Sequence, residues 1–331
     1  MEFTEITKIL DEIHASFVLL LCHHNADPDA ICSAYAFQSL LAKCRPNMAA
    51  EIGTGHGVSR LSKHILKRIP ITVNPQPNVE KTDAIVLLDT NTTQQLGKLA
   101  ERVTKTKAPI IVIDHHAVHP QTEQIAKLCI TNEEATSTCE IVYNFYKQLN
   151  IKPDLNEAKA LFLGITFDTR HFILATSSTL KTISELSDIG VTPQEELSSL
   201  ALPMDFSERV ARIKTCRRAN LIKIENWIIA LSHVSAYQAS AARALVNLGA
   251  HMAAVAGQKS EKIEISLRCT RDFNQITGIH LGRDIAKPLG EYLKGMGGGH
   301  ATAAGVNGAG YVEKGLKRCL RLVKEKLSNQ Q

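Results

Sequence analysis

The first half of the chain predicts an α/β fold organised around a parallel sheet. Short runs of Val, Ile and Leu alternate with longer stretches of helical spacing, which is the pattern of successive β-α-β units. The runs Phe17–Cys22, Ala84–Leu88 and Ile110–Ile113 contain no polar side chain, as expected for strands buried on both faces of such a sheet. The rest of the chain predicts a smaller α/β unit of its own.

The spacing of apolar residues also predicts the other elements of the first unit. Strands are expected near Met48–Ile52, Ile71–Asn74 and Lys127–Thr131, and helices at Asp29–Leu41, Ser137–Leu149 and Asn156–Gly164. Ser137 and Glu140 have the spacing of a capping box, for which a purely structural role is favoured over a functional one. The helix that ends near Gly164 leads into a loop that carries Asp168.

A domain boundary is indicated by two prolines, Pro193 and Pro203, and by the polar, basic helical stretch Phe206–Ala219 that follows them. We therefore expect a first domain at residues 1–190, a helical linker at 191–218 and a second domain at 219–331. In the second domain the pattern predicts strands at Trp227–His233 and Lys262–Arg268 and helices at Gln238–Leu248, Asp284–Leu293 and Val312–Leu327. The last of these helices is amphipathic and basic.

Composition places the chain among globular proteins and argues against several other classes. Hydrophobic residues make up 44% of the 331 residues and charged residues 21%, which is ordinary for a soluble domain. The apolar run near the N-terminus is far too short to span a bilayer and lacks the layout of a cleavable signal. The eight cysteines are scattered without a C-x-x-C pair, which disfavours zinc knuckles and predicts a reduced, cytoplasmic protein without membrane association.

The net charge of +5 is unevenly divided along the chain. Residues 205–331 carry 20 Lys and Arg against 10 Asp and Glu, which leaves 18 basic against 23 acidic side chains in residues 1–204. An acidic half suited to cations and a basic half suited to anions together favour a phosphate-bearing polymer or nucleotide as partner. Solvated basic helices would give the same balance, and charge alone favours neither explanation.

Acidic and imidazole side chains follow three of the predicted strands and one predicted helix. These residues are His23, Asp27, Asp29, Asp89, Asp114, His115, His116 and Asp168. The carboxyl ends of parallel strands share one rim of an open sheet, where ligands bind. Singly, each residue is typical of a helix cap or of the surface, but so many carboxylates on one rim would repel one another unless cations held them together.

The mixture of donor types indicates the kind of metal. Carboxylate and imidazole ligands without a thiolate favour Mn²⁺, with Mg²⁺ and Co²⁺ as alternatives, over structural Zn²⁺. Two such cations about 3.5–4 Å apart would activate a hydroxide and stabilise both the attacking and the leaving oxygen of a phosphoryl transfer. The sequence therefore predicts a two-metal phosphoesterase site.

A run of glycines stands out in the second domain, in the motif Gly297-Gly298-Gly299-His300. Without Cβ atoms the backbone of such a loop can adopt positive φ, and its amides can approach an anion closely. Arg268 and His300 would then clamp a terminal phosphate or a base, since a guanidinium binds phosphate through two hydrogen bonds. By itself the run is more typical of a turn. Gly53-x-Gly55-His56-Gly57 is interpreted as a flexible loop between a strand and a helix.

At these positions the sequence resembles the DHH phosphoesterases. The four motifs of the resemblance are His23-His24-Asn25-Ala26-Asp27-Pro28-Asp29-Ala30, Leu88-Asp89-Thr90, Ile113-Asp114-His115-His116 and Gly164-Ile165-Thr166-Phe167-Asp168-Thr169. The segment Gly297–Gly305 is similar to the signature of the DHHA1 domain. The resemblance covers nearly the whole chain, and domain order and length are most similar to the nanoRNase/oligoribonuclease branch and to archaeal RecJ-like exonucleases.

The resemblance implies a role for each of these residues. One metal would be held by His23, Asp27 and Asp89, and the other by Asp29, Asp89, His115 and Asp168. Asp114 would support the neighbouring histidines, and His116 would face the scissile phosphate as a proton donor or a stabilising charge. Asn25 would order a bridging water or its own loop.

Substrate-binding residues follow from the same resemblance. They are Arg268, Gly297, Gly298, Gly299 and His300, joined by Arg170. The last is a departure, because Arg170-His171 stands where many members of the family have a glycine. Arg170 is therefore either an additional cation for the substrate or a surface residue. A second departure is Ala26, at a position where proline is common, which affects only the stiffness of the loop.

The resemblance implies a Mn²⁺-dependent phosphodiesterase whose active site lies in the cleft between the two domains. It would hydrolyse single-stranded oligonucleotides, either short RNA or DNA, from one end and release nucleoside monophosphates. One alternative is an enzyme acting on a small molecule such as 3′-phosphoadenosine 5′-phosphate, a dinucleotide or pyrophosphate. Another is a non-catalytic subunit of a replication or repair assembly. A homodimer, and a DNA helicase or another replication or repair protein as partner, are compatible with the sequence.

Overall fold

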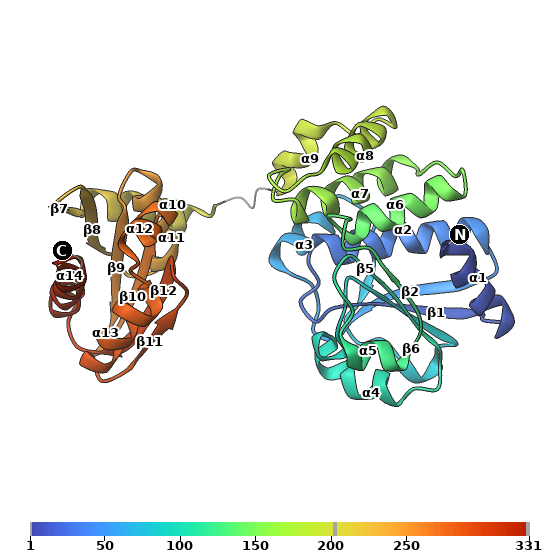
Figure 1. The fold of residues 1–331 in the computed structure, drawn as a ribbon, viewed down its shortest axis with the longest axis horizontal. Coiled ribbons are helices and arrows are strands. Elements are labelled where there is room, and N and C mark those ends of the chain that lie inside the picture. Colours follow the sequence, from blue (N-terminus) through green and yellow to red (C-terminus); the bar gives the residue numbers. More distant parts are fainter. Residues whose placement is uncertain (1, 201–203, 329–331) are drawn as a thin grey trace. The chain divides into compact units, whose positions relative to one another are not determined.

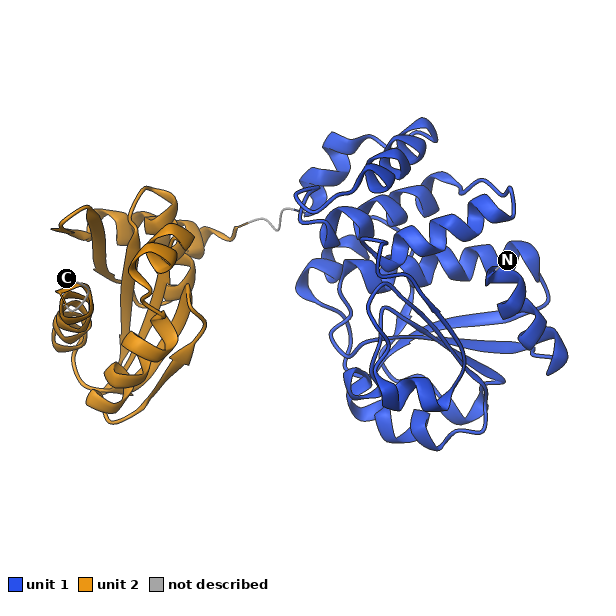
Figure 2. Ribbon diagram, viewed as in Figure 1, with its two compact units in different colours: residues 1–202 blue, residues 203–331 orange. Residues whose placement is uncertain are grey.

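The computed structural model describes residues 2–200 and 204–328, which divide into two units (Figures 1 and 2). Unit 1 comprises residues 1–202 and unit 2 residues 203–331. The division falls inside the segment 191–218, but the two helices of that segment belong to the units themselves. The first, α9 (Pro193–Leu200), is part of unit 1, and the second, α10 (Phe206–Arg217), is part of unit 2. Pro203, one of the two boundary prolines, lies outside the described residues.

Unit 1 is built on a six-stranded sheet in which neighbouring strands run parallel. The strand order is β3-β2-β1-β4-β5-β6, with these strands at Val73–Asn74, Ala49–Thr54, Phe17–Cys22, Ala84–Leu88, Ile110–Asp114 and Ala126–Thr131. The side chains of β1, β4 and β5 are almost all buried on both faces, as their apolar sequences predict. The structure therefore confirms the predicted parallel α/β unit.

Helices cover both faces of this sheet (Figure 1). The larger core lies on one face, where the packed helices include α1 (Glu2–Glu12), α2 (Pro28–Cys44), α6 (Thr138–Gln148) and α7 (Leu155–Asp168). The smaller core lies on the other face, under η1 (Val79–Lys81), η2 (Thr93–Leu99), α4 (Ala100–Lys105) and α5 (Pro120–Ile125). The remaining helices of unit 1 are α3 (Arg60–Ile65) and α8 (Ser177–Asp188). Across the described part of the chain, no helix combines the length and the apolar character needed to cross a membrane.

Unit 2 is built on a mixed six-stranded sheet of order β11-β12-β10-β9-β8-β7. In chain order its strands are β7 (Asn220–Ile224), β8 (Trp227–His233), β9 (Met252–Lys259), β10 (Lys262–Cys269), β11 (Met296–Gly299) and β12 (Ala303–Ala309). β8 and β9 run parallel, and the other pairs are antiparallel. One face packs against α12 (Arg271–Thr277), η3 (Leu281–Ala286), α13 (Lys287–Tyr292) and α14 (Val312–Ser328), and the other against α10 and α11 (Gln238–Asn247).

Several local predictions were wrong, mostly because of tertiary packing. Asp168 lies at the end of α7 rather than in a loop. Gly297–Gly299 form the edge strand β11 rather than a loop, and a Cβ on Gly297 would collide with the carbonyl group of Ala286. The loop predicted at Gly53–Gly57 does lie between a strand and a helix, β2 and α3, but it begins later, because Gly53 is still in β2, where a Cβ would collide with the ring of Pro77. In both strands glycine is needed for close approach of a neighbouring segment.

Candidate metal centre

The predicted ligands lie at the carboxyl ends of three adjacent strands of unit 1. His23 follows β1, Asp89 follows β4, and Asp114 is the last residue of β5, with His115 next. The strand order reverses between β1 and β4. Open parallel sheets bind their ligands at such a switch point, because the loops that leave the two strands diverge there and expose a crevice.

Three groups of side chains at this rim have ligand atoms within 4.8 Å of one another, close enough to hold a metal ion. They are His23, Asp27 and Asp89; Asp29, Asp89, His115 and Asp168; and Asp89, Asp114, His115 and His116. The first two groups are the sets that the sequence resemblance implies for two metals. Asp89 belongs to all three groups, so it is the common element of the cluster.

Asp89 occupies a strained position directly after β4. Its φ of 52° lies in the left-handed region, which costs a non-glycine residue about 1–2 kcal/mol. Its amide donates to the carbonyl oxygen of Ile113 at 3.1 Å, and its Oδ1 accepts from the Thr138 hydroxyl at 3.2 Å. Oδ2 lies 4.0 Å from Nε2 of His23, and Oδ1 lies 3.7 Å from Nε2 of His115. Each carboxylate oxygen therefore lies near a different histidine, so Asp89 stands between two sets of candidate ligands.

Asp29 is fully buried and is held by the N-terminus of α6. Its Oδ2 accepts from the Thr138 amide at 2.7 Å, and its Oδ1 accepts from the Cys139 amide at 3.0 Å. A helix N-terminus favours a carboxylate because its first amides lack partners within the helix and its dipole is positive there. A Cβ on Gly164 would collide with Cys139 Sγ and crowd Asp29 Oδ1, so this glycine lets α7 approach α2. The packing of three helices thus orients the carboxylate.

Sequence reasoning missed the part that Thr138 has in this site. Ser137 does cap α6, accepting from the Glu140 amide at 3.2 Å, but the predicted capping box is incomplete. The Glu140 carboxylate accepts from the amide and the hydroxyl of Thr136, at 3.0 and 2.9 Å, rather than from the amide of Ser137. The bond from Thr138 to Asp29 joins residues 109 positions apart, so no local pattern could have indicated it.

His116 is tied to Asp114. Its amide and its Nδ1 lie 2.8 and 2.9 Å from Oδ1 of Asp114. The hydrogen bond to this buried carboxylate raises the pKa of His116 to about 9, against the opposing effect of burial. The imidazole is therefore protonated at neutral pH, and because its side chain is 57% exposed it can meet a ligand.

The electrostatics of the cluster fit bound cations. Burial, reinforced by neighbouring carboxylates, raises the pKa of Asp89 to about 7 and that of Asp29 well above its ordinary value. Oδ2 of Asp114 is buried and has no hydrogen-bond partner among the described residues, and Nε2 of His115 lies 3.0 Å from Oδ2 of Asp168. Divalent cations would offset the repulsion and supply partners for such atoms, and the donors are of the types that Mn²⁺ and Mg²⁺ prefer.

Two of the predicted residues of unit 1 lie outside the three groups. Asn25 and Arg170 are both exposed, and their roles stay predictions. Arg170 begins an unusual turn directly after α7, in which it, His171 and Phe172 have φ of 51°, 57° and 69°. Phe172 packs its ring against Phe162, with 6.0 Å between the ring centroids, and so anchors the turn.

The predicted substrate-binding residues of unit 2 meet at one end of its sheet. Arg268 in β10 pairs with Ala303 in β12, whose carbonyl oxygen accepts from the His300 amide at 2.7 Å. Gly298 and Gly305 form a neighbouring cross-strand pair, and a Cβ on either would meet nothing within 4 Å. A guanidinium thus lies beside a flat, open stretch of backbone, a combination suited to a phosphate and a planar base.

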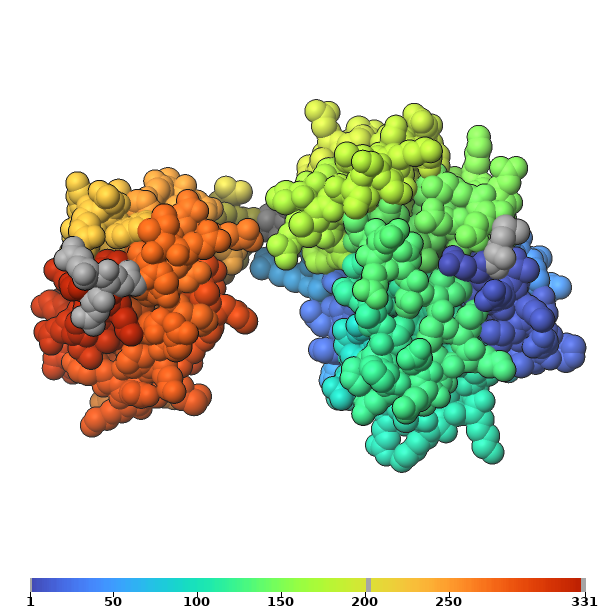
Figure 3. All heavy atoms as spheres, viewed as in Figure 1, coloured from blue at the N-terminus to red at the C-terminus, as the bar shows by residue number. Residues whose placement is uncertain are grey.

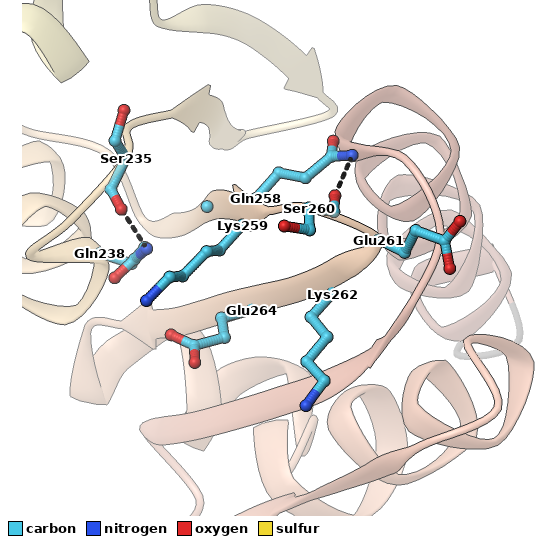
Figure 4. A pocket seen from close by; sticks show the side chains of 9 residues that line it. Ser235, Gln238, Gln258, Lys259, Ser260, Glu261, Lys262 and Glu264 are labelled. Carbon is cyan, nitrogen blue, oxygen red and sulfur yellow. Dashed lines mark hydrogen bonds between the residues drawn. The ribbon is translucent and has the colours of Figure 1, made fainter.

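A polar hollow of about 730 Å³ in unit 2 is distinct from this end of the sheet (Figure 4). It surrounds the turn between β9 and β10, and its lining residues include Lys259, Lys262 and Glu264 (Figure 4). Lys262 and Arg268 lie at opposite ends of β10, about 20 Å apart at 3.3 Å per residue. The mixed charges of the lining give this hollow no preference for an anion.

The relatives of this chain are consistent with a site of this kind. The profile described as DHH family, N-terminal domain, matches residues 17–165, which contain every residue of the three groups except Asp168. An uncharacterized protein of Methanocaldococcus jannaschii is 37% identical over 303 residues, which is 91% of this chain and 89% of the relative. The manganese-dependent inorganic pyrophosphatase of Bacillus subtilis is 28% identical over 198 residues, 58% of this chain and 62% of that enzyme.

A solved structure has a similar fold. The crystal structure of an exopolyphosphatase-related protein from Bacteroides fragilis matches with a TM-score of 0.65 and covers 100% of this chain and 98% of its own. The identity is 18%, so the likeness shows the fold alone.

Proposed function

Because this chain belongs to the DHH family, we propose that it is a manganese-dependent phosphodiesterase that hydrolyses short single-stranded oligonucleotides from one end. The observation that carries the proposal is the position of Asp89, with one carboxylate oxygen near His23 and the other near His115. Two ligand sets that share one carboxylate are what a two-metal phosphoesterase needs.

The residues of unit 1 would have different roles around the scissile phosphate. His23, Asp27 and Asp89 would hold one cation, and Asp29, Asp89, His115 and Asp168 the other. Bound there, the two cations would supply an activated hydroxide and offset the charge of the phosphate. The fold contributes preorganisation, because the α6 amides fix Asp29 and the Thr138 hydroxyl fixes Asp89 before any substrate binds.

His116 would act on the leaving group. Its hydrogen bond to Asp114 keeps it protonated at neutral pH, and the same bond orients the ring by holding Nδ1. Nε2 is then the nitrogen that can donate a proton to the leaving oxygen, or place a positive charge beside it. Asp114 would act through His116 and not on the substrate itself.

The oligonucleotide substrate is supported by unit 2. Arg268 and His300 lie at one end of a sheet whose adjoining surface, at Gly298 and Gly305, is bare backbone. A guanidinium suits a phosphate and a flat surface suits a base, so this end of the sheet would hold one terminal nucleotide. The excess of 20 basic over 10 acidic residues in 205–331 favours the same polyanionic substrate.

A small phosphorylated molecule is the second candidate. The similarity to a manganese-dependent pyrophosphatase favours it, and pyrophosphate, 3′-phosphoadenosine 5′-phosphate and dinucleotides are the substrates to consider. That similarity spans 58% of this chain and leaves a large part of it unmatched. A role of Gly297–His300 in substrate binding would also count against pyrophosphate.

Digestion of end-labelled RNA and DNA of two to twenty nucleotides with added Mn²⁺ tests the proposal, with pyrophosphate, 3′-phosphoadenosine 5′-phosphate and cyclic dinucleotides in parallel. We expect stepwise release of nucleoside monophosphates from one end, abolished by EDTA and by Asp89→Asn. Turnover of the small molecules alone would replace the proposal by the second candidate. Full turnover by a preparation verified to be metal-free would refute both.

A further inference from the structure

The exposed side of α14 carries a regular row of basic residues. Lys314, Lys317, Arg321 and Lys324 recur at intervals of three and four residues, and all four are exposed. At about 100° per residue they fall within an arc of about 80°, and they extend over about 15 Å of helix. We call these four residues the α14 stripe. The helix lies at the surface of unit 2 (Figures 1 and 3).

The α14 stripe is separate from the surface that carries Arg268. Leu322 and Val323 of α14 share a core with Leu267 of β10, so the helix packs on the face of the sheet to which Leu267 points. Successive residues of a strand point to opposite faces, and Arg268 therefore points to the other one. Unit 2 thus has two basic surfaces, one on each side of its sheet.

The α14 stripe has no ion-pair partner among the described residues, whereas the other basic residues of the helix do. Nη1 of Arg318 lies 3.5 Å from Oε1 of Glu325, and Nζ of Lys326 lies 3.7 Å from Oδ1 of Asp284. The fold neutralises these two cations internally and leaves the four cations of the stripe to solvent or to a ligand. Four unpaired positive charges in a line are complementary to a linear polyanion.

Exposed aromatic side chains lie beside the stripe. Tyr311 is 66% exposed, directly precedes α14, and lines a hollow of about 480 Å³ together with Lys314. Tyr292 is 53% exposed, and its ring centroid lies 5.8 Å from the guanidinium carbon of Arg318. Surfaces that bind single-stranded nucleic acids combine cations that follow the backbone with aromatic rings on which bases stack.

We propose that the α14 stripe, together with Tyr311, binds the phosphodiester backbone of a single-stranded nucleic acid. The inference goes beyond the proposed function and does not depend on it. A line of charges suits a polymer better than a single phosphate, which would call for convergent donors. A membrane surface fits less well, because the apolar side of α14 is part of the core of unit 2 and the exposed large apolar side chains do not include any of residues 312–328.

Binding of a labelled 20-nucleotide poly(U) RNA in EDTA, over a range of salt concentrations, tests this inference without interference from hydrolysis. The test variant replaces the stripe by glutamine (Lys314→Gln, Lys317→Gln, Arg321→Gln, Lys324→Gln). The control variant makes the same change of charge at four exposed residues of unit 1 (Lys63→Gln, Lys67→Gln, Lys81→Gln, Lys107→Gln). Thermal unfolding establishes that both variants are folded.

For the stripe variant, the slope of the logarithm of affinity against the logarithm of salt concentration should become shallower by up to about 2.8, at about 0.7 per phosphate contact. The control should keep the slope of the unmodified protein. Tyr311→Leu should weaken binding by on the order of tenfold through loss of stacking. Hydrolysis of a dinucleotide in Mn²⁺ should be unchanged in the stripe variant.

Equal slopes for the stripe and control variants would overturn the inference, as would a slope shallower than about one for the unmodified protein. Binding to vesicles of phosphatidylserine and phosphatidylcholine without binding to RNA would overturn it in favour of a membrane surface. If RNA binds as expected while no substrate is hydrolysed, the proposed function fails and this surface stands, so the two ideas are tested independently.

Discussion

Replacing Asp89 by Asn should change stability in opposite directions without and with metal. Burial and the surrounding carboxylates raise the pKa of Asp89 to about 7, from an ordinary value of 3.8. Without cations the folded state therefore holds this proton more tightly than the unfolded state, and stability falls as pH rises from about 4 to about 7. Above pH 7 the accumulated cost is about 4 kcal/mol, at 1.36 kcal/mol per pH unit. Asn has no charge and escapes this cost, while its oxygen can still accept from the Thr138 hydroxyl.

In added Mn²⁺ the unmodified protein should be more stable than the Asp89→Asn variant, which is the reverse of their order in EDTA. A cation that binds only the folded state at a hundred times its Kd adds about 2.7 kcal/mol to the free energy of unfolding, so two such cations would add about 5.4 kcal/mol and exceed the cost of about 4 kcal/mol. The unmodified protein should gain this amount, and the Asn variant, which lacks the shared anionic ligand, should gain little. Urea unfolding at pH 5 and pH 8, each in EDTA and in Mn²⁺, measures the four cases. In EDTA we expect the variant to be more stable by up to about 4 kcal/mol at pH 8 and by much less at pH 5.

Asp83→Asn is the control for the sign of the effect. Its Oδ2 accepts from the amides of Ser16 and Phe17, at 2.8 and 2.9 Å, and these bonds lower the pKa of Asp83. Because Asp83 belongs to none of the three groups, its replacement should destabilise the protein at pH 8 both in EDTA and in Mn²⁺. An Asp89→Asn variant that unfolds more easily than the unmodified protein in EDTA at pH 8 would refute the reasoning.

Three further predictions concern residues around the metal cluster. Asp114→Asn should replace the charged hydrogen bond that raises the pKa of His116 to about 9 by a neutral one, so the alkaline limb of kcat/KM against pH should move to lower pH; an unchanged profile would exclude His116 as the titrating group. Arg170→Gly should raise the free energy of unfolding by about 1 kcal/mol, because glycine adopts a φ of 51° without strain but has more chain entropy to lose. It should also lower kcat/KM on oligonucleotides, whereas His14→Gly, at the same φ of 51°, should raise stability alone. Arg268→Ala should lower kcat/KM on oligonucleotides roughly ten- to hundredfold, from a lost charged hydrogen bond of about 1.5–3 kcal/mol, and leave bound Mn²⁺ unchanged by metal analysis; loss of metal would assign it a structural role.

The rim could be predicted from sequence because its geometry follows from the order of elements along the chain. Once Phe17–Cys22 and Ala84–Leu88 are recognised as buried parallel strands, the residues that follow them must share one edge of the sheet. His23 and Asp89 therefore come close together without any knowledge of the helices. Each of these two residues directly follows its strand, so its position at the edge of the sheet is fixed once the strand is recognised.

The rest of the site could not be predicted, because it depends on contacts between segments that are far apart in the sequence. The amide of Thr138 reaches Asp29 only because α6 packs against α2, and the Gly164 backbone must be bare for α7 to join them. The predicted end of α7 was also wrong, because it too depends on interactions that the periodic pattern does not show. The Thr169 hydroxyl and amide both donate to the carbonyl oxygen of Ile165, at 2.7 and 3.0 Å, and extend the helix through Asp168. No periodic pattern marks such a boundary.

The environment of Asp89 is the reason that we expect cations at this rim. Its left-handed backbone costs about 1–2 kcal/mol. The raised pKa of its carboxyl, about 7, adds about 4 kcal/mol when the group is ionised. Among the residues that the structure describes, the hydrogen bond from Thr138 is the one contact of its side chain with a neutral donor, and such a bond contributes about 1 kcal/mol. Glycine at position 89 would remove both costs and keep the strand pairing to Ile113. The fold alone therefore disfavours an aspartate here, and divalent cations held by this cluster, as the proposed function requires, would offset these costs.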